Sequence, residues 1–196
     1  AALSGDLEAL RDRIERGDDV DGRYESGHTP LMYTCIYGHH ECARALIDAG
    51  AAVDMVDNTR WTALIIACAS GHHECALALI EAGASVDMVN DNDGYTALMK
   101  ACEFGQHECA QALINAYADL ALTNRDGQNA LMIACESQPS NLESQRQGKI
   151  RCALALLEAT APTREPGSPD RAALLKFAGE YLQQIELVLA SMYVIE

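Results

Sequence analysis

The 196-residue sequence is poor in basic residues, in aromatic residues and in long hydrophobic runs. It has 14 Lys and Arg against 29 Asp and Glu, which gives a formal net charge of −15. A charge of this sign repels phosphate backbones, so neither nucleic acid nor an anionic membrane surface is an expected partner. No run approaches the ~20 apolar residues of a membrane-spanning helix, so no span is predicted. One Trp, seven Tyr and two Phe are all the aromatic residues, so the positions that hold them are informative.

The remaining composition, 49% apolar and 22% charged, is that of a globular protein. A chain of this length buries roughly 70% of its unfolded surface, which is enough for a core. It opens Ala1-Ala2-Leu3, with neither an initiator Met nor a signal-like apolar stretch, and we expect a fragment or a processed form. We expect an intracellular, by default cytoplasmic, protein, although a targeting segment upstream of Ala1 would not be visible.

One pattern recurs along most of the chain with a period of 33 or 34 residues. The copy that begins at Gly27 reads G-H-T-P-L-M-Y-T-C-I-Y-G-H-H-E-C-A-R-A-L-I-D-A-G. The next copy begins at Arg60 and reads R-W-T-A-L-I-I-A-C-A-S-G-H-H-E-C-A-L-A-L-I-E-A-G. Several copies in register are a strong signal, unlike a single short motif.

Each copy predicts two short helices separated by a glycine. Thr29 precedes an apolar run and suits a helix cap, with Pro30 in the first turn. Gly38 ends that helix after about two turns. The second helix has an apolar face that includes Leu46, and Gly50 supplies its left-handed stop. One unit is too small to bury its own apolar face, so the units must stack, and the predicted fold is an all-α repeat solenoid.

The unit resembles the ankyrin repeat, which has a turn glycine, T-P-L-H-x-A, G-H-x-E and a second helix that ends L-L-x-x-G-A-D. The resemblance covers nearly the whole chain and implies stacked helix-turn-helix units with projecting β-turn or hairpin loops. The chain departs from the pattern where Arg60 replaces a turn glycine and Tyr117 replaces a helix-stop glycine. Four other residues replace the histidine of T-P-L-H: Met32, Ile65, Met99 and Met132.

The period divides residues 1–161 into a partial first repeat and four full repeats. The predicted ranges are 1–25, 26–58, 59–91, 92–125 and 126–161, the last with an insertion of about ten residues at 138–147. Residues 162–169 contain three prolines and a glycine and are predicted to form an extended connector. Residues 170–196 are predicted to form a helical cap, a degenerate sixth repeat of one helix or two.

Eight cysteines recur at two positions of the repeat. The first position holds Cys35, Cys68, Cys102 and Cys135, and the second holds Cys42, Cys75, Cys109 and Cys152. We expect them to be reduced and buried as small hydrophobic residues. A zinc site is a weaker alternative, because Gln106 replaces the first histidine of G-H-H-E-C in the third copy. We expect no metal, no cofactor and no Cys/His catalytic dyad, since nothing supplies an orienting acid and oxyanion donors in a defined pocket.

The resemblance implies that a partner binds the concave face, which the loop tips and the exposed side of the first helices form. Two kinds of position on this face vary within the family, and the predicted partner-binding residues occupy them: His28, Ile36, Tyr37, Trp61, Ser70, Tyr95, Glu103, Phe104 and Gln128. Large aromatic residues dominate binding hot spots, although each aromatic residue here would also suit packing on a neighbouring repeat. Three acids in the projecting turns are predicted to flank this surface: Asp57, Asp91 and Asp93.

These patterns favour a non-catalytic protein-interaction module or scaffold. Residues 26–120 contain three basic and twelve acidic residues, which favours a protein partner with a basic or mixed-charge face. One alternative is a structural subunit of a multi-protein assembly, docked through residues 138–147 and the apolar tail at 187–195. A thiol or zinc protein is a third hypothesis.

Overall fold

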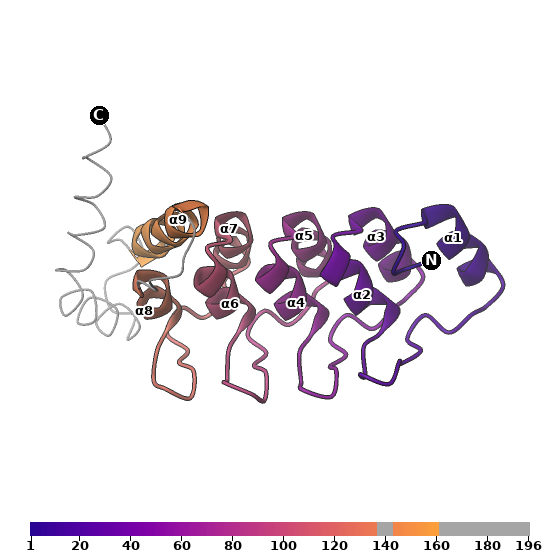
Figure 1. The fold of residues 1–196 in the computed structure, drawn as a ribbon, viewed down its shortest axis with the longest axis horizontal. Helices are drawn as coiled ribbons and strands as arrows, with labels where there is room; N and C mark the ends of the chain where they lie inside the picture. The colour runs from indigo at the N-terminus through magenta and orange to yellow at the C-terminus, as the bar shows by residue number, and fades with distance from the viewer. Residues whose placement is uncertain (137–142, 161–196) are drawn as a thin grey trace.

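The computed structural model describes residues 1–136 and 143–160, which form two rows of helices with loops projecting to one side (Figure 1). The helices are α1 (Leu7–Glu15), α2 (Pro30–Tyr37), α3 (His40–Asp48), α4 (Ala63–Ser70), α5 (His73–Glu81), α6 (Ala97–Phe104), α7 (His107–Asn115), α8 (Ala130–Cys135) and α9 (Glu143–Thr160). The even-numbered helices lie beside the loops and form the first row. The odd-numbered helices form the second row. The predicted all-α solenoid is therefore confirmed.

The first-row helices begin and end where the sequence predicts. The side chain of Thr29 accepts a hydrogen bond from the backbone N–H of Met32, and Pro30 occupies the first turn of α2. Thr62, Thr96 and Asn129 cap α4, α6 and α8 in the same way. Gly38 ends α2 in the left-handed conformation, and a Cβ there would lie 2.6 Å from the His72 ring. Conformation and the close approach of the next repeat both require glycine at this position.

The core runs between the two rows through every described repeat. Leu31, Leu64 and Leu98 of the first row and Leu79 and Leu113 of the second row are at most 2% exposed. Each first-row helix contacts the next one in its row, and each second-row helix does the same. The apolar faces are therefore buried by stacking, as expected for a solenoid.

Side chains and backbone also join neighbouring loops. The carboxylates of Asp21, Asp54 and Asp87 each accept a hydrogen bond from a backbone N–H of the following repeat. The backbone N–H of Asn58 donates to the carbonyl of Ser26, and that of Asp91 donates to the carbonyl of Thr59. These links fix the loops relative to one another, so the surface that they carry exists before any partner binds.

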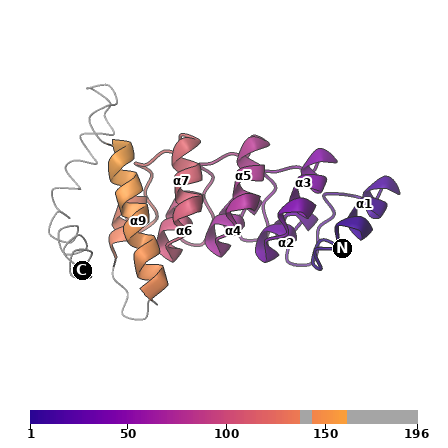
Figure 2. The ribbon, with the colours of Figure 1, turned by 90° about the horizontal axis from the view of Figure 1, so that it is seen from above.

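The two ends of the array differ from its centre. Residues 1–25 contribute α1 alone to the second row, as a partial first repeat would. At the other end, α9 has 18 residues where the earlier second-row helices have nine, and it begins within the expected insertion at 138–147. Figure 2 shows α9 lying alongside both α7 and α6. Among the described residues, no helix has both the length and the apolar character to cross a bilayer. The predicted connector at 162–169 and cap at 170–196 lie outside the described residues.

Candidate protein-interaction surface

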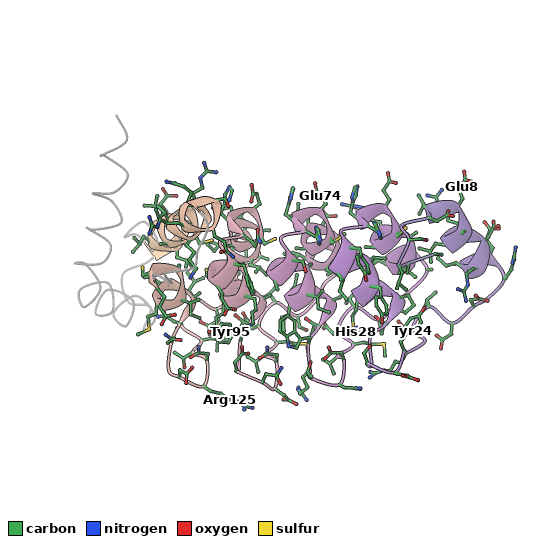
Figure 3. All side chains as sticks on the ribbon, in the orientation of Figure 1. Glu8, Tyr24, His28, Glu74, Tyr95 and Arg125 are labelled. Carbon is green, nitrogen blue, oxygen red and sulfur yellow. The ribbon has the colours of Figure 1, made fainter. Side chains whose placement is uncertain are left out.

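The predicted concave face combines the loops with the outward side of the first-row helices. Figure 3 labels His28 and Tyr95 where the loops meet these helices, and Arg125 at a loop tip. The nine predicted partner-binding residues come from four successive repeats.

A lysine lies at the centre of this surface. The Lys100 ammonium is 3.9 Å from the centroid of the Tyr95 ring and 5.5 Å from that of Trp61. It donates hydrogen bonds to Asp93 Oδ2 and Glu103 Oε2, both at 2.9 Å. Lys100 is only 6% exposed. The two aromatic rings therefore enclose a paired cation contributed by the protein itself, and the cation–π contact adds to the two ion pairs.

Charge pairing shifts the pKa values in this cluster. Burial opposes the charged form of Lys100, but its hydrogen bonds to Glu103 and Asp93 outweigh burial and raise its pKa. Burial likewise opposes ionisation of Asp93, but hydrogen bonding to Lys100 lowers its pKa overall. Burial and the nearby Glu103 raise the pKa of Tyr95. Both shifts favour the charged forms of Lys100 and Asp93.

Sequence reasoning did not select Lys100, although the repeat alignment contains a signal for it. The matching residues in the neighbouring repeats are Ile66 and Ile133, which are both buried. A charged residue at a position that is otherwise apolar, five residues after Tyr95 and four before Phe104, indicates an internal ion pair. Its partners depend on how side chains meet in space, which the period does not specify.

The predicted aromatic residues fall into two groups. Tyr37 is 51% exposed and Phe104 is 36% exposed, so both offer apolar surface to a partner. Trp61 and Tyr95 are half-buried and pack against the core, as does Ile36. The alternative of packing on neighbouring repeats therefore describes part of the role of Trp61 and Tyr95.

The remaining predicted residues are polar and mostly engaged with their neighbours. His28 Nε2 lies 3.2 Å from Asp57 Oδ2, and the His28 ring meets Tyr33 edge-on. Gln128 hydrogen-bonds to Glu136, while Ser70 is exposed.

The three acids predicted to flank the surface all have partners within the chain. Asp57 accepts hydrogen bonds from the backbone N–H groups of Thr59 and Trp61, which closes its loop. Asp91 pairs with Arg60 at 3.4 Å between exposed side chains. Asp93 pairs with Lys100. These acids therefore organise the loops, and only the exposed Asp91 pair is open to exchange with a partner's charges.

The G-H-H-E-C segments are occupied by packing and backbone contacts. His72 Nε2 lies 3.2 Å from the carbonyl oxygen of Ile36, and His39 Nε2 lies 3.3 Å from that of Leu3. Each contact joins the histidine after the glycine to the backbone of the preceding repeat. All eight cysteines are buried, as expected for small apolar packing. Within residues 1–136 and 143–160, no cluster of three or more His, Cys, Asp or Glu side chains is arranged to hold a metal ion.

A cavity of about 270 Å³ lies beside α1, near the N-terminus, and away from the predicted concave face. Its apolar lining includes Leu10, Ile14, Val20 and Leu46. None of the nine predicted partner-binding residues lines it. The predicted surface is instead spread over four repeats, as is typical of protein recognition rather than of an enclosed small-molecule site.

Comparison with protein families gives one match. A family model described as ankyrin repeats in three copies matches residues 1–90 and again residues 82–165. A search of curated proteins found none that matches the chain.

Proposed function

The chain belongs to the ankyrin repeat family, and we propose that it is a non-catalytic interaction module that binds a partner protein on its concave face. Ankyrin repeats are typically protein-binding modules, and no catalytic family matches the chain. The observation that carries the proposal is the group of aromatic residues on this face. Trp61 and Tyr95 enclose Lys100, and Tyr37 and Phe104 stand exposed on either side along the array.

Preorganisation supports this function. Loop-to-loop hydrogen bonds and the Lys100 ion pairs fix the surface, so binding orders few side chains and loses little conformational entropy. Aromatic side chains held in this way resemble the anchors that dominate measured interfaces.

The charge of the surface favours a partner with a basic or mixed-charge face. Asp93 and Glu103 together outnumber the single ammonium of Lys100, and Asp91 is exposed beside them. Charges at the rim of an interface act mainly on association rate and salt dependence. We therefore expect association with the partner to slow as ionic strength rises.

Affinity capture from the native source tests this proposal, with bound proteins identified by mass spectrometry. We expect Phe104→Ala and Tyr37→Ala to reduce capture of the partner without lowering the melting temperature. Tyr117→Ala is the matched control, because Tyr117 is an exposed aromatic residue at the end of α7, in the second row.

Binding measurements with the captured partner then test the centre of the surface. Trp61→Ala should weaken binding at least tenfold, mainly by raising the dissociation rate, because truncating a central aromatic anchor typically costs ~2 kcal/mol or more. If deletion of residues 138–147 abolishes binding while Trp61→Ala leaves it intact, the concave-face proposal is wrong and the assembly-subunit alternative replaces it.

A further inference from the structure

The cysteines form two rows that face each other across repeat boundaries. One row lies in the first-row helices α2, α4, α6 and α8, and the other lies in the second-row helices α3, α5, α7 and α9. Three of the four first-row cysteines each meet the cysteine of the second-row helix one repeat later. The contacts define three cross-repeat thiol pairs: Cys35–Cys75, Cys68–Cys109 and Cys102–Cys152.

The geometry is the same at both ends of this series. In each pair the second-row thiol is near enough to raise the pKa of the first-row thiol. The helices that carry the first and the third pair, α2 with α5 and α6 with α9, contact each other. Cys75 Sγ also lies 3.8 Å from the carbonyl oxygen of Thr34, the residue before Cys35. Cys152 Sγ lies 4.0 Å from the carbonyl oxygen of Ala101, the residue before Cys102. The six paired cysteines are at most 1% exposed.

The one-repeat offset explains which cysteines are left out of the pairs. The partner of Cys42 would lie in a first-row helix before α2, and the partner of Cys135 would lie in a second-row helix after α9. The described residues contain neither helix. Cys42 and Cys135 are buried as well, so they provide an internal comparison for the effect of pairing alone.

Packing alone does not require this arrangement. Free cysteine behaves as a small hydrophobic residue, and another small apolar side chain would fill such a site. Here both sides of the contact are cysteine at every boundary where both helices are described. A disulfide joins Cβ atoms about 3.5–4.5 Å apart, so thiols that face each other are its first precondition.

We propose that the three cross-repeat thiol pairs are redox-sensitive sites at which a two-electron oxidant of the peroxide class links neighbouring repeats through disulfides. One thiolate attacks hydrogen peroxide, the O–O bond breaks, and a sulfenic acid and hydroxide form. The partner thiol then attacks that sulfur, the S–S bond forms, and the S–O bond breaks with release of water. Two thiols and one hydrogen peroxide thus give one disulfide and two water molecules.

Burial makes this reaction selective rather than fast. Hydrogen bonding to Cys75 and burial both raise the pKa of Cys35, while the hydrogen bond from Cys35 lowers the pKa of Cys75. In the closed array Cys75 is therefore the more acidic thiol of its pair. Because peroxide reaches these thiols only when two repeats separate locally, reclosure presents the oxidised sulfur to its cross-repeat partner and to no other cysteine.

Peptide mapping of the full chain tests the pairing. The reduced chain is exposed to hydrogen peroxide under native conditions, its remaining thiols are alkylated, and disulfide-linked peptides are mapped by mass spectrometry without reduction. We expect links 35–75, 68–109 and 102–152, with Cys42 and Cys135 alkylated. The same oxidation in urea should give mixed pairings.

Single variants and stability complete the test. Cys75→Ala should remove only the 35–75 link, Cys109→Ala only the 68–109 link, and the control Cys42→Ala none. The oxidised chain should unfold at a higher urea concentration than the reduced chain, and dithiothreitol should reverse the shift. The proposal is overturned if the native chain retains eight thiols under conditions that oxidise the unfolded chain. It is also overturned if Cys42 and Cys135 join disulfides as often as the six paired cysteines.

Discussion

At the residue scale, Lys100 shows how a single charged residue can organise a surface when it occupies a repeat position that is apolar in the adjacent repeats. The residues at the matching position of the adjacent repeats are Ile66 and Ile133, whose branched apolar side chains are buried. Lys100 packs its aliphatic stem in the same place and directs its ammonium to the carboxylates of Asp93 and Glu103. One cation therefore contacts two acids and two aromatic rings that come from different elements.

Lys100→Met should lower the free energy of unfolding by roughly 1–3 kcal/mol at neutral pH, because two partly buried carboxylates lose their cation. Removing one partner of a fully buried ion pair costs more, about 3–5 kcal/mol. The loss should depend on pH. Lys100 lowers the pKa of Asp93 in the folded protein. The stability that this ion pair contributes is therefore fully present above the pKa that Asp93 has in the unfolded chain. It is lost as the pH falls through the lower pKa that Asp93 has in the folded protein. Urea unfolding of both proteins should give a difference that shrinks in acid. A pH-independent difference would mean that packing of the stem dominates.

Gly83→Val should lower the free energy of unfolding by roughly 1–2 kcal/mol. Gly83 follows α5 with a φ of +82°, a conformation in which a β-branched residue is strained. A Cβ at Gly83 would meet no atom within 4 Å, so the cost is conformational and not steric. Thermal unfolding measures it.

Tyr117 provides the reciprocal control for this prediction. It occupies the corresponding helix stop with a φ of +60°. Tyr117→Gly should therefore leave the melting temperature unchanged or raise it. If Gly83→Val melts like the original chain, the left-handed stop contributes nothing to stability.

At the element scale, the local signals in the sequence are sufficient for most helix ends. A capping hydroxyl and a left-handed glycine act within three or four residues, so Thr62 and Gly71 mark the ends of α4 from the sequence alone. The site is harder to predict, because its contacts join residues of different repeats. The pairing of Lys100, the burial of Trp61 and the offset of the cysteines depend on the angle at which repeats stack.

The last described helix is the element that local signals specify least. Residues 143–147 read E-S-Q-R-Q, which favours a helix but has no apolar period to fix its start. Tertiary contact supplies the missing constraint. Gly148 packs directly against the backbone of Gly105, so α9 continues through a glycine that corresponds to a helix break in the earlier repeats.

Gly148→Ala should therefore destabilise the α9 end of the array by roughly 1–3 kcal/mol, because the new methyl group would overlap the carbonyl of Gly105 and overpack the contact. Alanine is otherwise the better helix former, so an isolated helix would gain stability from this change. Ser144→Ala is the matched control, since Ser144 lies exposed in the same helix. Chemical unfolding of both variants separates the two effects, and a stabilised Gly148→Ala would show that α9 shifts away from Gly105 freely.

At the scale of the whole molecule, stability is distributed along one dimension. Each repeat contacts only its neighbours, so the free energy of unfolding is approximately a sum of repeat and interface contributions. Among the described helices, α1 packs on one neighbour in its row, whereas α5 packs on two. This predicts a gradient of local stability along the array, with α1 at its lower end because α1 packs principally on α3.

Hydrogen exchange with paired variants measures that gradient. In the unchanged chain, the amides of α1 should exchange faster than those of α5, because separating α1 from α3 breaks a single interface. Leu10→Ala should accelerate exchange in α1 alone, since Leu10 is the buried residue of that helix. Leu79→Ala removes a side chain that is 0% exposed and lies between two interfaces, so the free energy of unfolding should fall by about 2–5 kcal/mol. Hydrogen exchange should become faster in α3, α5 and α7 together. If Leu10→Ala instead accelerates all helices equally, the chain unfolds as one cooperative unit, and a nearest-neighbour description of this array is wrong.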